Sequence, residues 1–375
     1  MQCKMRFHHA LKHVYIVKQK MRMMELKESI EAFFSDIPLV EAVKVEAEVM
    51  PSDEVGSQVV DAEVMLVMAS GNQLRLFLEF KSKGEPRLAR DAVNQLKRFV
   101  ESYPDVYPVF VAPYISPASA ELCRNEDVGY IDFAGNGCLC YGDLYIERTG
   151  KPNPFRTSRS LKSMYQPRSS RVLRVLLAHS LRLWKQKELK EEAQVSLGQV
   201  NNVVKLLWER EWVEKESAGL RLIAPEKLLT DWSKNYTVEK NERFDFYSLL
   251  PLPELEERLA GYCLETKMRF AFTCFSAAAR LAPTVRYKRV TAYVGSDISR
   301  LSARLELKSV TTGANVILMR PYDDGVFYGI GLSEEPVVCP PQLYLDLLQE
   351  AGRGEDAAKA VLNVMRETLW PEISQ

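Results

Sequence analysis

The chain has 375 residues and a mass of 42.8 kDa, which is two to three times the usual domain size and predicts two or three domains. A hydrophobic fraction of 46% and a charged fraction of 27% are typical of globular proteins and argue against disordered, collagenous and coiled-coil classes. Fifty basic and fifty acidic side chains cancel, so any attraction to nucleic acid must come from a local cluster of charge.

Cysteine, histidine and hydropathy patterns narrow the class further. The seven cysteines include no CxxC pair, and three of the four histidines lie within the first 13 residues, which argues against a zinc site or a histidine-based catalytic dyad. No stretch approaches the ~18 apolar residues of a membrane span, and the N-terminus lacks the apolar run of a signal peptide. We therefore expect reduced thiols, no membrane contact and a cytoplasmic location.

The first third of the chain alternates strand and helix patterns after a basic arm at residues 1–24. Period-two alternation predicts strands at 60–68 and 74–81, joined by a turn at 70–72. A helix at 88–100, a strand at 106–112, a short helix at 117–124 and a strand at 129–133 follow. This order predicts a small mixed sheet with helices on its faces, in a domain at residues 1–150.

Three residues of this pattern, Asp61, Glu79 and Lys81, have the side chains of a metal-dependent hydrolase. A three-residue hairpin loop at 70–72 places Asp61 opposite Lys81 and Glu63 opposite Glu79 on one face of the sheet, whereas a two-residue loop puts Asp61 on the other face. Neighbouring carboxylates suit Mg²⁺ or Mn²⁺, and a lysine stabilises the charge that develops during phosphodiester hydrolysis. The alternative is a solvated cross-strand ion pair.

The same segment resembles the PD-(D/E)xK restriction-endonuclease-like superfamily. The resemblance rests on Asp61 near the start of one strand, Glu79-Phe80-Lys81 at the end of the next, and an amphipathic helix that carries Gln95. It implies that Asp61 and Glu79 hold the metal ion, that Lys81 assists the attacking water, and that Gln95 belongs to the catalytic set. Val60 stands where that superfamily often has a proline.

The middle of the chain is strongly basic. Residues 151–190 contain eleven basic side chains and one acidic side chain, Glu188, a net charge of +10. Residues 151–168 are rich in proline and serine and predict a linker. Helical patterns follow at 171–180, at 186–194 and after Ser196, which forms a capping box with Gln199. Segments 211–215 and 220–223 then flank a turn at 217–219 and predict a hairpin.

These three helices and the hairpin resemble the winged helix-turn-helix superfamily over residues 169–235. In the third helix, apolar residues at helical spacing leave amide and basic side chains on the outer face, where such a helix reads base edges in the major groove. The basic block would add affinity for phosphates, although a winged helix that contacts protein is the alternative. The side chains expected to contact duplex DNA are Arg171, Arg174, Lys187, Ser196, Gln199, Asn201, Asn202, Lys205, Lys215 and Arg221.

The last third predicts an α+β domain at residues 245–375, separated from the middle by the polar stretch 231–245. Strand patterns at 269–275, 290–294, 305–310, 315–319 and 326–330 precede helices at 341–349 and 355–369. The stretch from Pro340 to Leu348 and the run Gly352-Arg353-Gly354-Glu355-Asp356 resemble the C-terminal signature of abortive-infection, type IV toxin–antitoxin antitoxins, a family of transcriptional regulators. The resemblance implies binding to DNA upstream of its own operon and a nucleotidyltransferase-like toxin as partner.

The expected fold is therefore multidomain α/β and α+β: a restriction-endonuclease-like mixed sheet, a central winged helix and a C-terminal α+β domain. The nuclease-like first domain is an addition to the simplest antitoxin layout. Two functions follow from these patterns. The first is a DNA-binding regulator of the antitoxin kind, and the alternative is a Mg²⁺-dependent DNA endonuclease whose winged helix binds the target.

Overall fold

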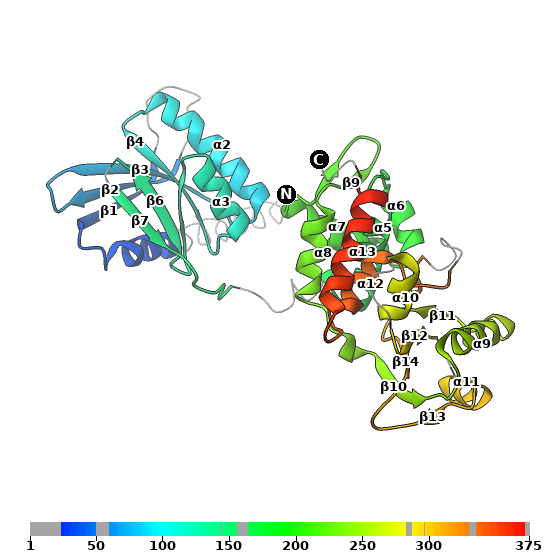
Figure 1. Ribbon diagram of the computed structural model, residues 1–375. Helices are drawn as coiled ribbons and strands as arrows, with labels where there is room; N and C mark the ends of the chain where they lie inside the picture. The colour runs from blue at the N-terminus through cyan, green and yellow to red at the C-terminus, as the bar shows by residue number, and fades with distance from the viewer. Residues whose placement is uncertain are drawn as a thin grey trace, which may run out of the picture. The chain divides into compact units, whose positions relative to one another are not determined.

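The computed structural model describes residues 24–49, 60–142, 144–155, 164–282, 287–295, 297–329 and 335–371. The chain divides into two compact units, residues 1–156 and 157–375 (Figure 1). The predicted basic arm, apart from Met24, and positions 156–163 of the predicted linker lie outside the described residues. Across the described ranges, no helix has both the length and the apolar character that crossing a membrane would require.

The first unit is built on a seven-stranded mixed sheet whose strands lie side by side in sequence order. The pairs β3–β4 and β4–β5 are parallel, and the other neighbours are antiparallel. A helix at 24–34 precedes the sheet. The remaining elements are β1 (Val40–Val49), β2 (Val60–Met68), β3 (Gln73–Phe80), α2 (Pro86–Ser102), β4 (Val106–Ala112), α3 (Pro117–Asn125), β5 (Gly129–Asp132), β6 (Gly137–Tyr141) and β7 (Leu144–Arg148).

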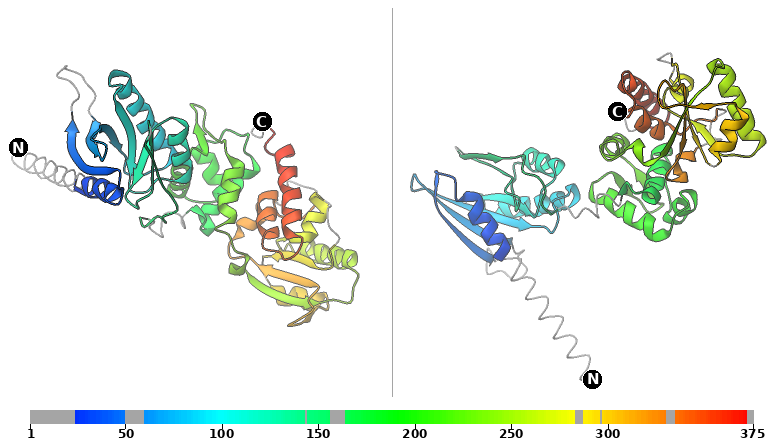
Figure 2. Two further views of the ribbon diagram at one scale, coloured as in Figure 1. Left: turned by 60° about the vertical axis from the view of Figure 1, so that its left-hand side comes forward. Right: turned by 90° about the horizontal axis from the view of Figure 1, so that it is seen from below.

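Both faces of this sheet are covered by helices. Leu26, Ile30 and Phe34 of the first helix pack on one face, against alternate residues of β2 and β3. The opposite face packs against α2 and α3, and its core includes Phe77 and Phe110. Figure 2 shows the first helix in dark blue and α2 and α3 in cyan on opposite sides of the sheet. This layering places Glu79, two residues after Phe77, on the face that α2 covers.

The hairpin between β2 and β3 corrects the predicted register. Its three-residue loop consists of residues 69–71 instead of 70–72, because Met68 N–H donates to the Asn72 carbonyl at 2.8 Å. Gly71 adopts a φ of +83°, which suits glycine in this loop position. The observed pairs Ala62–Leu78 and Glu63–Phe77 show that Glu63 does not lie opposite Glu79. The loop length stays odd, so the four charged residues still share one face.

The second unit begins with three helices and a short hairpin, in the predicted order, and continues into a five-stranded sheet covered by helices. Its first elements are α5 (Pro167–Ala178), α6 (Gln186–Glu192), α7 (Leu197–Glu209), β8 (Val213–Lys215), β9 (Leu220–Leu222) and α8 (Pro225–Ser233). Those that follow are η1 (Val238–Lys240), β10 (Glu242–Tyr247), α9 (Leu252–Glu265), β11 (Phe270–Phe272), α10 (Cys274–Leu281), β12 (Val290–Val294), α11 (Ile298–Arg304), β13 (Lys308–Ser309), β14 (Val316–Arg320), η2 (Asp324–Phe327), α12 (Pro340–Leu347) and α13 (Gly354–Thr368).

One continuous core runs through this unit. The tryptophans at 184, 232 and 370 are buried in it: Trp184 lies between α5 and α6 and bridges to Leu220 of β9, Trp232 belongs to α8, and Trp370 follows α13. The polar stretch 231–245 lies within this packing, because Trp232 and Tyr236 are buried and Glu242–Tyr247 forms β10. The division of this unit at 235 and 245 therefore stays a prediction.

The C-terminal sheet has the strand order β11-β12-β14-β10-β13, with β12 and β14 parallel. Two predicted strands are corrected. Residues 305–310 yield only the two-residue β13 because Leu305 caps α11, and residues 324–327 form the 3-10 helix η2 because the Asp323 side chain accepts from Gly325 N–H at 2.8 Å. The expected mixed α/β and α+β fold class is otherwise confirmed.

Candidate functional site

Four polar side chains meet where β3 ends in the first unit. Lys81 Nζ lies 2.7 Å from Glu79 Oε1, and Gln95 Nε2 of α2 donates to Glu79 Oε2 at 2.9 Å. Asp61 Oδ2 accepts from Phe80 N–H at 2.8 Å, which joins the start of β2 to the end of β3. The structure thus brings together all four residues that the sequence assigned to a catalytic site.

The burial of this cluster differs from one side chain to the next. Glu79 is 4% exposed, whereas Asp61, Lys81 and Gln95 are half-buried. A buried carboxylate is costly unless it is paired and hydrogen-bonded, and Lys81 and Gln95 supply both. Glu63, which lies on the same face of the sheet, instead forms an ion pair with Arg75 at 2.7 Å.

The oxygen atoms of this cluster fit a hard divalent cation. Asp61 and Glu79 belong to neighbouring strands and face the same side of the sheet, where directly opposed side chains have Cβ atoms about 5 Å apart. An ionised carboxylate has about four lone-pair positions on its two oxygens, and Mg²⁺ completes its octahedral shell with water. Within the described residues, no group of three or more His, Cys, Asp or Glu side chains is placed to hold a metal ion. Asp61 and Glu79 are the two carboxylates that the cluster itself offers to such an ion.

The second candidate surface is the outer face of α7. Val200, Val203, Val204 and Leu207 are buried, and this packing leaves Asn201, Asn202 and Lys205 exposed. The Ser196 side chain accepts from Gln199 N–H at 3.2 Å and caps the helix. Two amides in the first half of a capped helix and one lysine in its second half are therefore presented on this face.

Two of the predicted DNA-contacting arginines instead hold the second unit together. Arg174 is fully buried: its Nε and Nη2 donate to Gln342 Oε1 at 3.0 and 2.5 Å, and its guanidinium stacks on Trp232. Arg171 forms a two-pronged pair with Asp323 at 2.8 Å, and its side chain is 21% exposed. Both predictions are wrong because α5 turns this side toward the C-terminal elements.

Further predicted contacts are altered by local partners. The Gln199 side chain donates to Ser169 Oγ of α5, which occupies it within the fold. On the hairpin, Arg221 lies 3.6 Å from Glu214 and 3.3 Å from Glu216, so its charge is offset. Lys215 is exposed, and its ammonium lies 4.5 Å from the centroid of the Trp208 ring.

The structure also presents cations that the sequence prediction did not include. Arg168 is exposed in the first turn of α5, and the neighbouring Ser169 touches α7 through Gln199. Pro167 at the first helical position was the available signal, because proline is favoured there and moves the start of the helix before residue 171. Exposed cations on or beside α5, α6 and α7 include Arg168, Lys185, Lys187, Lys190 and Lys205.

Comparison with known proteins identifies a large part of the second unit. Residues 221–367 match the family described as transcriptional regulator, AbiEi antitoxin, type IV toxin–antitoxin system. This segment is antitoxin-like. The match begins at β9 and ends in α13, so it covers less than half of the chain and leaves α5, α6 and α7 before its first residue.

Solved structures that are similar to this chain include an EndoMS complex with double-stranded DNA and a repair endonuclease from Pyrococcus abyssi. The first has 22% identity and a TM-score of 0.19, and the match covers 27% of this chain and 41% of that one. The second has 21% identity and a TM-score of 0.20, with 28% and 44% covered. The chain thus spans less than half of each of these proteins. No curated protein matches the chain.

Proposed function

We propose that this protein is a DNA-binding transcriptional regulator of the type IV antitoxin kind. The observation that carries the proposal is the exposed face of α7, with Asn201, Asn202 and Lys205, on a unit whose residues 221–367 match the antitoxin family. The three helices and the hairpin have the order of a winged helix-turn-helix. In such units the third helix enters the major groove and the hairpin lies beside it.

The proposed contacts divide by chemistry. Asn201 and Asn202 would bind adenine edges, because an amide can donate to adenine N7 and accept from its N6 amino group in a two-pronged bond. Arg168, Lys187 and Lys205 would bind phosphates, and their exposed positions allow this. The neutral total charge of the chain makes this local cluster the source of affinity. The antitoxin likeness further suggests DNA upstream of its own operon and a nucleotidyltransferase-like toxin as partners, in the cytoplasm.

An amide substitution on α7 tests this proposal. Asn202→Ala should weaken binding to the specific upstream DNA by about 1 to 3 kcal/mol and leave binding to random duplex nearly unchanged. Asn363→Ala, which removes an exposed amide from α13, is the matched control and should change neither. Equal losses on both DNAs would show that α7 does not read bases, and the proposal of specific readout would fail.

A second candidate function, a Mg²⁺-dependent DNA endonuclease of the PD-(D/E)xK kind, is favoured by the cluster of Asp61, Glu79, Lys81 and Gln95. A divalent ion bound by Asp61 and Glu79 would activate water and offset phosphoryl charge. Lys81, held 2.7 Å from Glu79, carries a positive charge at the place where negative charge would develop. Gln95 fixes the orientation of the Glu79 carboxylate through its 2.9 Å hydrogen bond.

Cleavage assays separate this second function from a silent nuclease-like domain. With Mg²⁺, the wild-type protein should cut DNA, and Lys81→Ala should abolish cutting while DNA affinity is retained, because Lys81 acts on the reacting phosphate. Lys97→Ala is the control, since Lys97 lies on α2 but is paired with Glu126. Absence of both cutting and metal binding on single- and double-stranded DNA would rule out the endonuclease.

A further inference from the structure

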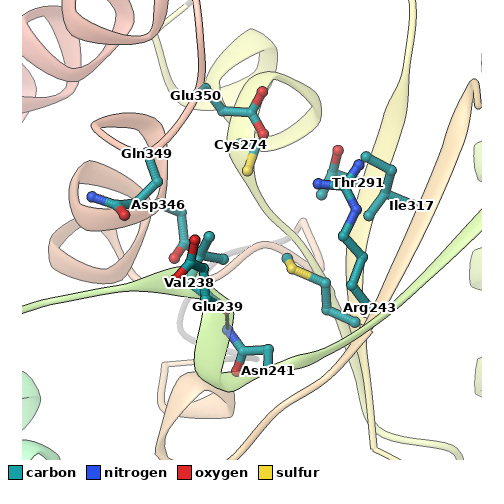
Figure 3. Close-up of a pocket in the computed structure, with 11 residues that line it drawn as sticks. Val238, Glu239, Asn241, Arg243, Cys274, Thr291, Ile317, Asp346, Gln349 and Glu350 are labelled. Carbon is teal, nitrogen blue, oxygen red and sulfur yellow. Dashed lines mark hydrogen bonds between the residues drawn. The ribbon is translucent and has the colours of Figure 1, made fainter.

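A cavity of about 300 Å³ lies in the second unit, between the C-terminal sheet and α12. Its outer part is formed by the exposed Glu239 and Arg243, and its inner part reaches the buried side chains of Cys274 and Asp346. Figure 3 shows Asp346, Glu350 and Cys274 on one side of the space and Ile317 and Thr291 on the other. The cavity is therefore lined by exposed charged residues and by a buried carboxylate, and it has one polar wall and one partly apolar wall.

Asp346 is the unusual member of this lining. It is 1% exposed and accepts hydrogen bonds from Tyr236, Tyr293, Thr273 and Gln342 at 2.5 to 3.1 Å. Burial raises the pKa of this carboxyl group, and the four hydrogen bonds act in the opposite direction by favouring its ionised form. All four donors are neutral, so the negative charge is hydrogen-bonded but has no cation in direct contact among them.

The nearest arginine on this network is one side chain away. Arg174 donates to Gln342 Oε1, while Gln342 Nε2 donates to Asp346 Oδ1 at 2.8 Å. A buried charge is stabilised far better by a directly opposed charge than through an intervening amide. The other face of Asp346 borders the cavity, which provides the space for such a countercharge.

The charges of the remaining lining favour the same kind of ligand. Glu239 and Glu350 add two carboxylates, and Arg243, the lining cation, lies 2.9 Å from Asp245. Glu350 lies 2.5 Å from Arg289, so these two charges offset each other, as those of Arg243 and Asp245 do, and the negative charge of the lining comes from Glu239 and Asp346. Val238, Ile317 and Met319 provide apolar surface beside these acids.

We propose that this cavity is a binding site for a small organic cation, in which an amidinium, guanidinium or ammonium group lies beside Asp346 and its apolar body packs against Ile317 and Met319. The proposal joins three independent features of the structure. They are a cavity with an exposed rim, a buried carboxylate that Arg174 reaches only through Gln342, and an apolar wall that faces this carboxylate.

Occupancy of this site would be transmitted to the DNA-binding helices, a consequence that rests on the proposed function. Gln342 connects Asp346 to Arg174 of α5, and Ser169 of the same helix connects to Gln199 of α7. A cation that competes for Asp346 weakens its bond with Gln342 and frees Arg174 to shift. The ligand would therefore lower DNA affinity.

Calorimetry with benzamidine as the probe tests the site, because this molecule has an amidinium on an apolar ring. The full chain should bind benzamidine with one-to-one stoichiometry and bind benzamide, its neutral isostere, at least about tenfold more weakly. Glu239→Gln, at the exposed rim, should weaken benzamidine binding several-fold without unfolding the protein, whereas Glu257→Gln on α9 should have no effect. No binding, or equal binding of the two probes, overturns the site.

Fluorescence anisotropy with a labelled duplex tests the coupling. Saturating benzamidine should weaken duplex binding about fivefold or more in the wild type, and the same concentration should have a smaller effect on Glu239→Gln. If DNA affinity is unchanged when benzamidine fills the cavity, the proposed coupling is wrong, but the proposed binding site is not contradicted. If the chain binds no duplex at all, the proposed function and the proposed effect of the ligand on DNA affinity are both wrong. Calorimetry with benzamidine then still tests whether the cavity binds the cation.

Discussion

Replacing Arg174 by alanine should destabilise the second unit without directly removing a DNA contact. The substitution leaves the Gln342 carbonyl without its two donors and removes the guanidinium from Trp232. It also removes the cation that the buried network shares with Asp346. Breaking a buried charged network in this way costs about 3 to 5 kcal/mol. A unit of 219 residues, from 157 to 375, shifts its melting temperature by about 2 to 4 °C per kcal/mol.

Differential scanning calorimetry of the full chain should therefore show the melting temperature of this unit lowered by at least about 6 °C. Arg168→Ala is the matched control, because Arg168 is exposed on the same helix, and it should change stability by less than about 0.5 kcal/mol while lowering DNA affinity. Arg174→Lys should fall between these two variants. A wild-type melting temperature for Arg174→Ala would refute the assignment of this arginine to the buried network.

Three further predictions concern the other sites. Asp61→Asn should weaken Mn²⁺ binding measured by calorimetry, since it removes one of two neighbouring carboxylate ligands, and unchanged binding would place the metal elsewhere. Burial acts to raise the pKa of Asp323, but hydrogen bonds from Arg171 and Gly325 N–H outweigh it and hold the pKa below the usual value for an aspartate. The stability that this carboxylate contributes is thus present above about pH 3.8 and is lost as the pH falls further. The free energy of unfolding, measured with urea, should therefore fall more between about pH 5 and pH 2 for the wild type than for Asp323→Asn. Gln199→Ala should lower stability and affect specific and random DNA alike, because its side chain contacts Ser169; a loss confined to the specific site would contradict this.

The cluster of the first unit could be predicted because strand alternation and an odd hairpin loop are local properties. The register was wrong because the alternation of polar and apolar residues is unchanged when the loop shifts by one position at each end. Asp61, Glu79 and Lys81 therefore keep their common face under either register. Gln95 was identified by resemblance, and its bond with Glu79 depends on how α2 packs.

The DNA interface could be predicted only in part, because the sequence does not show which partners lie across the fold. Helical spacing correctly left Asn201, Asn202 and Lys205 outside the core of α7. Arg171 and Arg174 have the same residue type as a phosphate contact, yet their partners Asp323 and Gln342 are more than 150 positions away in sequence. Pairing over such distances leaves no periodic signal.

The salt dependence of DNA binding tests the central proposal most directly. Anisotropy titrations with the upstream duplex between about 50 and 200 mM salt should give a log-log slope near −0.9 for each phosphate contact, or about −2.7 for Arg168, Lys187 and Lys205 together. Lys205→Ala should reduce the steepness of that slope by about 0.9, and the control Lys359→Ala on α13 should leave it unchanged. An affinity that does not change with salt, or an equal effect of both substitutions, would contradict DNA binding through this face.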